Sequence, residues 1–413
     1  MRHGKNKKGQ IDIQLSSFAN SERESCHKLQ RQFNASKSHN RCCSSLRKKK
    51  GQIDIQFNWV FMLIIGGVIL LFFFGLILKQ KDTTETKIAA NIKEDLSSIM
   101  TGSSISTGTA SLIEISEIEM EFDCEGYRIG SVSPIDPHIS FSPNRMVGNE
   151  LIVWSLDWNV PYRVANFLYI TSPRIRYVIV DDAGYLAEEL NETLPPGTII
   201  KDDLEKPFFV KEIVKENELA NIKDQNYDKI RFIFFGKGTN IPDTMLDDLD
   251  KDADDISAIS INGNSIDGFG NVYFFKKSKL SNTWTPDPSA SEYESFYLGQ
   301  ASLIGAIFTE DIETYECNMQ NAFDHFSIVT MIYENKTNAL VNYYKEKSDT
   351  SCQSSMVGAS DTLEKMRLLA GEISETLYSG TVYTLVSELY NDYILNFIDD
   401  NDNIQRLSCA EIY

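Results

Sequence analysis

The chain has 413 residues, 42% of them hydrophobic, and a formal net charge of −19 at pH 7. This hydrophobic share excludes a wholly disordered chain, a collagen and a disulfide miniprotein, and the length accommodates about two or three domains. The charge is unevenly divided, because residues 1–50 carry 13 basic and 3 acidic side chains whereas residues 51–413 carry 27 and 56. So acidic a body argues against nucleic acid as a partner.

Residues 1–48 form a basic head rich in Ser and Asn. It has too little apolar sequence to bury, so we expect a disordered cytoplasmic segment. The octapeptide KKGQIDIQ occurs twice, at 7–14 and at 49–56, and only the second copy runs into an apolar segment. Eight residues are too few for a structural repeat. We therefore interpret the first copy as a local duplication or as a sign of a shifted translation start.

Residues 57–78 are uncharged and carry no polar stripe. As a helix they would be about 33 Å long, which is enough to cross a bilayer core. Four basic residues at 47–50 precede the segment, and the chain that follows it is acidic. The positive-inside rule then predicts a single-pass protein with a cytoplasmic N-terminus and residues 79–413 outside the cell membrane. A secretory signal peptide fits less well, because the apolar run is too long and no A-x-A exit follows.

The second octapeptide, with a Lys directly before Gly51 and Gln52 and an apolar helix after it, resembles the class III signal of archaeal type IV pilin-like proteins. The resemblance covers residues 49–78 only. It implies cleavage between Gly51 and Gln52, and assembly of the mature subunits through the apolar helix.

Two positions depart from the pilin-like pattern. Asp54 stands where a Ser is usual, and Gln56 stands where a Glu is usual. That Glu neutralises the terminal amine of a neighbouring subunit, and Gln56 cannot supply the charge. An ordinary uncleaved signal anchor therefore remains the alternative interpretation.

Residues 79–110 predict a helical stalk that ends in the linker TGSSISTG. Residues 111–295 predict an extracytoplasmic α/β domain, because short apolar runs alternate with helical stretches, which favours a partly parallel mixed sheet with flanking helices. Strands are expected at 118–122, 127–132, 151–156, 175–180, 208–213, 230–235, 256–261 and 271–275, and helices at 162–170, 185–190, 216–224 and 243–249. The last two strands are joined by NGNSIDGFG, which is typical of an antiparallel hairpin.

Residues 296–413 predict a C-terminal helical region. Apolar residues recur at spacings of three and four over 312–344, and helical stretches follow at 362–377 and 381–398. Helices with this pattern are expected to form a hairpin or bundle against the sheet or each other.

Four cysteines follow the predicted span: Cys124, Cys317, Cys352 and Cys409. An even number outside the cell allows two disulfides. None has C-x-x-C spacing, which argues against a zinc or thioredoxin-like site. The helix order favours pairing Cys317 with Cys409 and Cys124 with Cys352, while a pair of Cys317 with Cys352, or four buried thiols, are alternatives.

Two acidic groups are weak metal candidates. Asp181 and Asp182 end a predicted strand, where carboxylates hold a metal or cap the next helix. Asp248, Asp250 and Asp252 alternate as in a calcium loop, but the bend-forming Gly and the closing Glu are missing, so a solvated acidic helix end is the favoured interpretation. Asn191 and Asn335 begin N-x-T triplets and are candidate glycosylation sites.

The sequence contains no strong catalytic motif, so we expect no enzyme activity, no catalytic residue and no cofactor. The favoured function is a membrane-anchored extracytoplasmic structural or interaction protein, in its sharpest form a pilin-like surface subunit. Its partners are then the lipid bilayer and, through the anchor helix, other copies or other surface proteins. The alternatives are a ligand-binding or sensory ectodomain that does not assemble, and a membrane-anchored metal-dependent hydrolase using Asp181 and Asp182.

Overall fold

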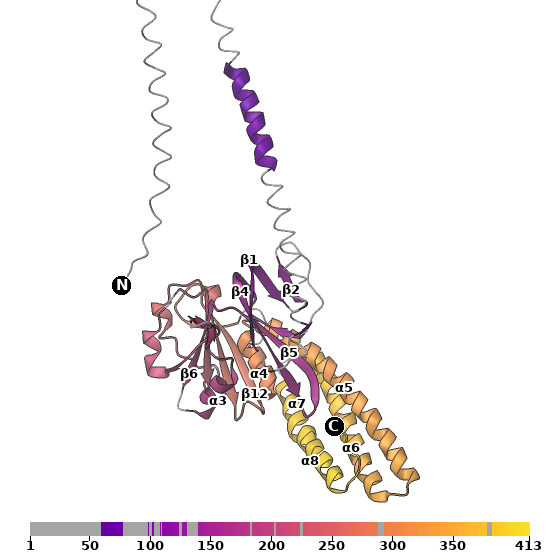
Figure 1. The fold of residues 1–413 in the computed structure, drawn as a ribbon. Helices are drawn as coiled ribbons and strands as arrows, with labels where there is room; N and C mark the ends of the chain where they lie inside the picture. Colours follow the sequence, from indigo (N-terminus) through magenta and orange to yellow (C-terminus); the bar gives the residue numbers. More distant parts are fainter. Residues whose placement is uncertain are drawn as a thin grey trace, which may run out of the picture. The chain divides into compact units, whose positions relative to one another are not determined.

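The computed structural model divides the chain into two compact units, Met1–Gly75 and Leu76–Tyr413. The structure describes residues 59–76, 98, 101–102, 108, 110–123, 126–129, 139–181, 184–201, 204–223, 226–287, 293–377 and 382–413. Of the first unit it describes residues 59–75, which belong to the helix Trp59–Leu76 (Figure 1). The basic head, the signal residues Gly51 and Gln52, and most of the predicted stalk lie outside the described residues.

A five-stranded sheet in the order β2-β1-β4-β5-β3 opens the second unit. Neighbouring strands are antiparallel except for the pair β3 and β5. Its strands are β1 (Ser111–Asp123), β2 (Gly126–Ile129), β3 (Ser140–Phe141), β4 (Arg145–Asn159) and β5 (Arg163–Thr171).

The helix predicted over 162–170 is wrong, because these residues form strand β5. The run is rich in β-branched and aromatic side chains, which pack well in a pleated sheet. It pairs with β4 along most of its length, from Arg163 opposite Asn159 to Thr171 opposite Ile152. A short apolar run fits either period, and pairing with β4 decides this one.

The second sheet has the order β13-β12-β11-β10-β6-β9, with β14 also paired to β12. Strands β9, β6, β10 and β11 are parallel to one another, and β12 is antiparallel to β11, so the predicted partly parallel sheet and its terminal hairpin are confirmed. The strands are β6 (Ile175–Asp181), β9 (Val210–Lys215), β10 (Lys229–Phe235), β11 (Ile256–Gly263), β12 (Phe269–Lys277), β13 (Trp284–Pro286) and β14 (Glu294–Leu298).

Among the described residues of these connections, one segment forms a full helix, namely α3 (Tyr185–Thr193), which agrees with the prediction. The other two predicted helices form short 3-10 segments, because each occupies only a few residues of the connection. The helix predicted over 216–224 is replaced by η1 (Glu216–Asn221) and the one over 243–249 by η2 (Leu246–Asp248), and a further 3-10 segment, η3 (Ala253–Asp255), lies outside both predictions. A separate two-stranded sheet consists of β7 (Thr198–Lys201) and β8 (Leu204–Pro207).

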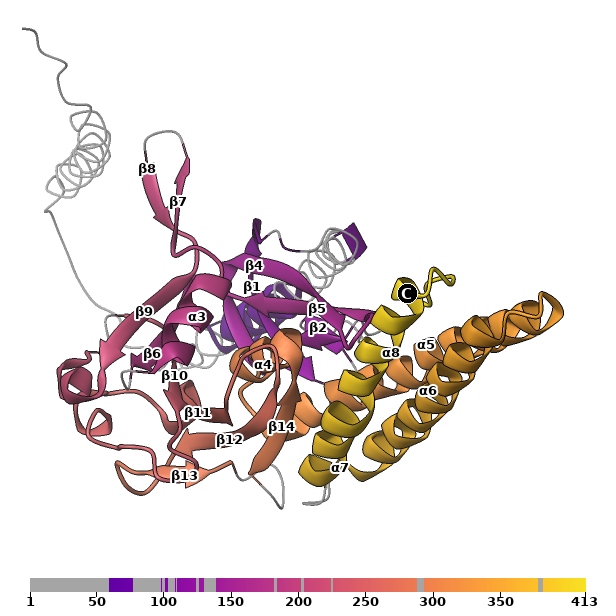
Figure 2. The ribbon, with the colours of Figure 1, turned by 90° about the horizontal axis from the view of Figure 1, so that it is seen from below.

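The C-terminal part is helical as predicted, and α5 and α6 form a long antiparallel hairpin with α8 beside it (Figures 1 and 2). Asp311 and Asp349 cap the amino ends of α5 and α6 through the amides of Thr314 and Cys352. The elements are α4 (Gly299–Phe308), α5 (Ile312–Glu346), α6 (Thr350–Thr376), α7 (Val382–Glu388), the π-helical segment η4 (Leu389–Ile394) and α8 (Leu395–Arg406).

Helix α4 is buried at every residue except Gln300 and contacts β4, β5 and β14 (Figure 2). Large aromatic side chains fix it there: the indole of Trp158 donates to the carbonyl of Leu298 at 2.8 Å, and the hydroxyl of Tyr169 donates to the carbonyl of Ala301 at 2.7 Å. One continuous apolar core extends from the first sheet through α4 to α5, α6 and α8. A smaller core lies between the second sheet and the 3-10 segments.

Candidate functional site

The helix Trp59–Leu76 is long and apolar enough to cross a membrane. Its 18 residues correspond to about 27 Å along the helix axis. Its large apolar side chains are exposed by 42% at Ile65 to 73% at Leu71, so every side of the helix presents apolar surface. A surface of this kind needs a lipid or protein environment.

A charged groove lies at the amino ends of the parallel strands β6, β10 and β11. It consists of two adjoining hollows with cavity volumes of about 360 and 680 Å³, which share Arg145, Lys251 and Asp255. Six of the side chains that line the groove are basic and four are acidic. The basic ones are Arg145, Arg174, Lys229, Lys251, Lys277 and Lys279, and the acidic ones are Asp228, Asp252, Asp254 and Asp255.

The two arginines of the groove are held differently. Arg174 makes a two-pronged ion pair with Asp228, with Nε and one terminal nitrogen 2.6 and 2.7 Å from the carboxylate oxygens, and this pair raises the pKa of Arg174. Arg145 is bound only through Nε, which donates to Glu119 on the neighbouring strand β1. Within the described part of the chain, the terminal nitrogens of Arg145 therefore have no partner.

A nearly buried ion pair lies beside the groove at the start of β10. The amino group of Lys229 donates to both carboxylate oxygens of Glu310, at 2.8 and 2.6 Å. Both side chains are nearly buried, with 12% and 10% exposure. Because Lys229 begins β10 and Glu310 lies between α4 and α5, the pair fixes the strand end against the helices.

Arg231 stabilises the same junction. Its guanidinium is fully buried and donates to the carbonyls of Ala306, Ile307 and Thr309 at the carboxyl end of α4, at 3.0, 3.2 and 2.6 Å. Burial lowers the pKa of Arg231 to about 10, so it stays charged at neutral pH. A cation at this helix end is favourable because it meets the negative end of the helix dipole.

The predicted metal residues do not converge. Asp181 ends β6, and Asp182 lies outside the described residues. Asp248 forms an ion pair with Lys223 at 3.0 Å, and Asp250 and Asp252 are exposed near the 3-10 segments. Over the described ranges, no group of three or more His, Cys, Asp or Glu side chains is arranged to hold a metal ion.

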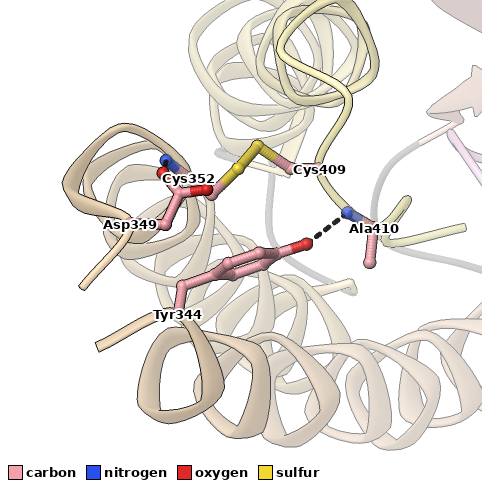
Figure 3. The surroundings of a disulfide bond; sticks show 5 residues. All are labelled: Tyr344, Asp349, Cys352, Cys409 and Ala410. Atoms are coloured by element: carbon pink, nitrogen blue, oxygen red, sulfur yellow. Dashed lines mark hydrogen bonds between the residues drawn. A yellow bond between two sulfur atoms is a disulfide. The ribbon is translucent and has the colours of Figure 1, made fainter. Parts of the chain in front are cut away.

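The disulfide pairing differs from each predicted pairing. Cys352, in the first turn of α6, is bonded to Cys409, which follows α8, with their Cα atoms 5.7 Å apart (Figure 3). The expected pairs of Cys409 with Cys317, and of Cys352 with Cys124 or Cys317, are therefore wrong. The chain turns back after α8 and brings Cys409 to the start of α6. Cys317 is also disulfide-bonded, and Cys124 lies outside the described residues.

Both candidate glycosylation triplets lie on helices. Asn191 is in α3, and the hydroxyl of Thr193 donates to the carbonyl of Glu189 at 2.9 Å. Asn335 is exposed on α5, but Thr337 is buried and its hydroxyl donates to a backbone carbonyl one turn earlier, at 2.8 Å. The threonine of each triplet is thus engaged within the folded domain.

No protein-family model, curated protein or solved structure matches the chain. Sequence reasoning did not find the groove, because its residues come from segments far apart in the chain. One local signal was present: a basic residue stands directly before or at the start of two buried strands, at Arg174 and Lys229.

Proposed function

We propose that this protein is a single-pass membrane-anchored surface module, with its N-terminus in the cytoplasm and residues 79–413 outside, whose anchor helix assembles with other copies after pilin-like processing. The observation that carries the proposal is the helix Trp59–Leu76, which is apolar all round and has none of its residues buried. In water such a surface would be strongly unfavourable, whereas a bilayer or a bundle of like helices would cover it.

The outer domain supports the proposed orientation. Disulfides persist in oxidising compartments and are rare in the cytoplasm. The disulfide between Cys352 and Cys409 links the start of α6 to the segment after α8. An extracytoplasmic location suits a domain that contains such a bond. The basic cluster before the anchor points the same way, because positive residues are retained on the cytoplasmic side.

Assembly is supported by the order of the signal residues. A basic residue, Gly51 and Gln52 stand four residues before the apolar segment, as in pilin-like precursors. Removal of the head leaves a chain that begins almost at the apolar helix. Apolar helices in a bilayer associate laterally through van der Waals packing and interhelical hydrogen bonds.

Mass spectrometry of the membrane-extracted protein tests the processing step. We expect a mature chain that begins at Gln52. Gly51→Val should block cleavage and leave the basic head attached. The duplicated octapeptide offers a matched control, because Gly9→Val makes the same change in the copy without an apolar helix and should leave processing unaltered.

Chemical cross-linking of intact membranes tests the assembly step. We expect a ladder of multimers from the native chain that is strongly reduced in Gly51→Val and unchanged in Gly9→Val. A native chain that retains residues 48–50 would contradict processing and indicate an uncleaved anchor. A correctly processed chain that yields only monomers would contradict assembly and favour an ectodomain that acts alone.

A further inference from the structure

We infer that the charged groove at the amino ends of β6, β10 and β11 binds a small organic anion, with a carboxylate or phosphate group on a body the size of a monosaccharide. Neither anchoring nor assembly uses this groove, so the inference goes beyond the proposed function and does not depend on it.

Arg145 is the central anion-binding residue. It lines both hollows, its side chain is 62% exposed, and it is bound only through Nε among the residues that the structure describes. The two terminal nitrogens therefore remain available as a planar fork, and this fork matches the two oxygens of a carboxylate or phosphate. The pair with Glu119 orients the guanidinium without using that fork.

Lysines on the other side of the groove add positive charge. Lys251 also lines both hollows, and Lys277 donates to the carbonyls of Leu249 and Lys251 at 3.0 and 3.2 Å. These bonds order the backbone that carries Lys251. Lys279 is paired with Asp254 at 2.9 Å, but both side chains are 72% exposed, so this pair is weak and opens easily.

One wall of the smaller hollow is suited to an uncharged body. Met146, Val147, Ile175 and Tyr227 line it beside the charged groups. The guanidinium of Arg176 lies 5.7 Å from the centre of the Tyr227 ring and holds one side of it. A volume of about 360 Å³ is at the small end of the range for ligand pockets, roughly 300–1,000 Å³, which corresponds to a single sugar ring with its charged group.

The charge of the remaining chain restricts the size of the anion. Residues 51–413 carry 27 basic and 56 acidic side chains, whereas basic side chains slightly outnumber acidic ones among those that line the groove. A long polyanion would extend beyond the groove and be repelled by the surrounding carboxylates. A small anion is attracted locally and avoids this repulsion.

The groove is also rigid, which favours binding. The ion pair of Lys229 with Glu310 and the bonds of Arg231 to the end of α4 both fix strand β10, whose amino end lines the groove. Asp228 holds Arg174 in a fixed orientation at 2.6 Å. Little ordering is therefore needed when a ligand enters, and less binding free energy is lost.

Calorimetric titration of the full chain in detergent micelles tests the inference, with galacturonate and inorganic phosphate as probes and neutral galactose as the control. We expect saturable binding of at least one anionic probe and none of galactose. Arg145→Gln should weaken that binding about tenfold or more, as expected when a charge-assisted bond is lost. Arg128→Gln is the matched control, because Arg128 is also exposed and paired with acids but lies on β2, and it should leave binding unchanged.

Arg145→Lys distinguishes a loss of binding from a folding defect. It keeps the positive charge but removes the planar guanidinium. We expect intermediate affinity for the anionic probe and an unchanged melting temperature. Failure of both anionic probes to bind at 10 mM would overturn the inference. Equal weakening by Arg145→Gln and Arg128→Gln would also overturn it, because the attraction would then be nonspecific. Tighter binding of a long sulfated polysaccharide than of the single sugar would contradict the restriction to small anions.

Discussion

The ring of Tyr413, the last residue of the chain, stacks on the ring of Phe397 with centroids 5.6 Å apart and planes inclined by 24°. Tyr162, at the turn between β4 and β5, meets the Tyr413 ring edge-on at 5.8 Å. Ile412, which precedes Tyr413, is fully buried, and its carbonyl accepts a hydrogen bond from the amino group of Lys336 at 2.7 Å. The C-terminal tail therefore joins α5, α8 and the first sheet.

Tyr413→Ala should lower the free energy of unfolding by about 1–2 kcal/mol, because each aromatic pair contributes roughly 0.5–1.5 kcal/mol and part of the ring is exposed. Urea denaturation followed by tyrosine and tryptophan fluorescence measures the change. Tyr185→Ala is the control, since Tyr185 is 71% exposed and its loss should have little effect. Equal losses in the two variants would show that the tail contributes nothing beyond exposed surface.

The bond between Cys352 and Cys409 should stabilise the helical part by about 2–4 kcal/mol, because it closes a loop with a sequence separation of 57. Cys352→Ser, Cys409→Ser and the double variant should lose the same amount, since each removes the one bond. Thermal unfolding under non-reducing conditions measures it. Peptide mapping that linked either cysteine to Cys317 would contradict the pairing.

Two helical glycines should respond oppositely to alanine. A Cβ on Gly305 of α4 would lie 2.9 Å from the ring of Phe141, so Gly305→Ala should destabilise the fold by about 1–3 kcal/mol through overpacking. A Cβ on Gly358 of α6 would meet nothing within 4 Å. Gly358→Ala should therefore stabilise the fold by about 0.5–1 kcal/mol through helix propensity. We would measure the denaturation midpoint of each variant relative to the native chain. Shifts in the same direction for both variants would contradict the central position of α4.

Asp255 should make stability and ligand binding depend on pH. Burial raises the pKa of this carboxyl in the folded state, with the nearby Lys229 opposing the shift. A raised folded pKa means that the ionised form costs stability above that pKa, and that the cost disappears as the pH falls through it. Asp255→Asn should therefore raise the melting temperature at pH 7, and the difference from the native chain should shrink towards pH 3.

The neighbouring residue supplies the control for that experiment. Asp254→Asn changes an exposed carboxylate paired with Lys279 and should leave the melting temperature nearly constant at both pH values. Asp255→Asn also removes a negative charge from the groove and should strengthen the binding of the anionic probes. A melting temperature at pH 7 that falls in Asp255→Asn would contradict the sign of this argument.

Local patterns predicted much of the fold. The runs YVIV and FIFF are apolar without interruption, and both became parallel strands buried on both faces, β6 and β10. The spacing of three and four over 312–344 predicted α5 almost to its ends. These elements could be predicted locally because the buried faces of a strand or helix determine the spacing of its apolar residues.

The errors arose where the answer depends on distant partners. Residues 163–171 form a strand because β4 lies beside them, and their own apolar run fits a helix equally well. The pairing of Cys352 with Cys409 depends on the tail turning back after α8. The groove depends on the strand order, which brings Arg174, Lys229 and Lys251 together from three separate parts of the chain.

The loop closed by Cys352 and Cys409 contains most of α6 and the whole of α7 and α8. A protease that cuts once within this loop therefore produces two pieces that stay covalently joined. On a non-reducing gel the nicked chain would migrate with the intact protein, and only a reductant would separate its fragments. Such a cut therefore leaves the C-terminal helices attached to the rest of the molecule.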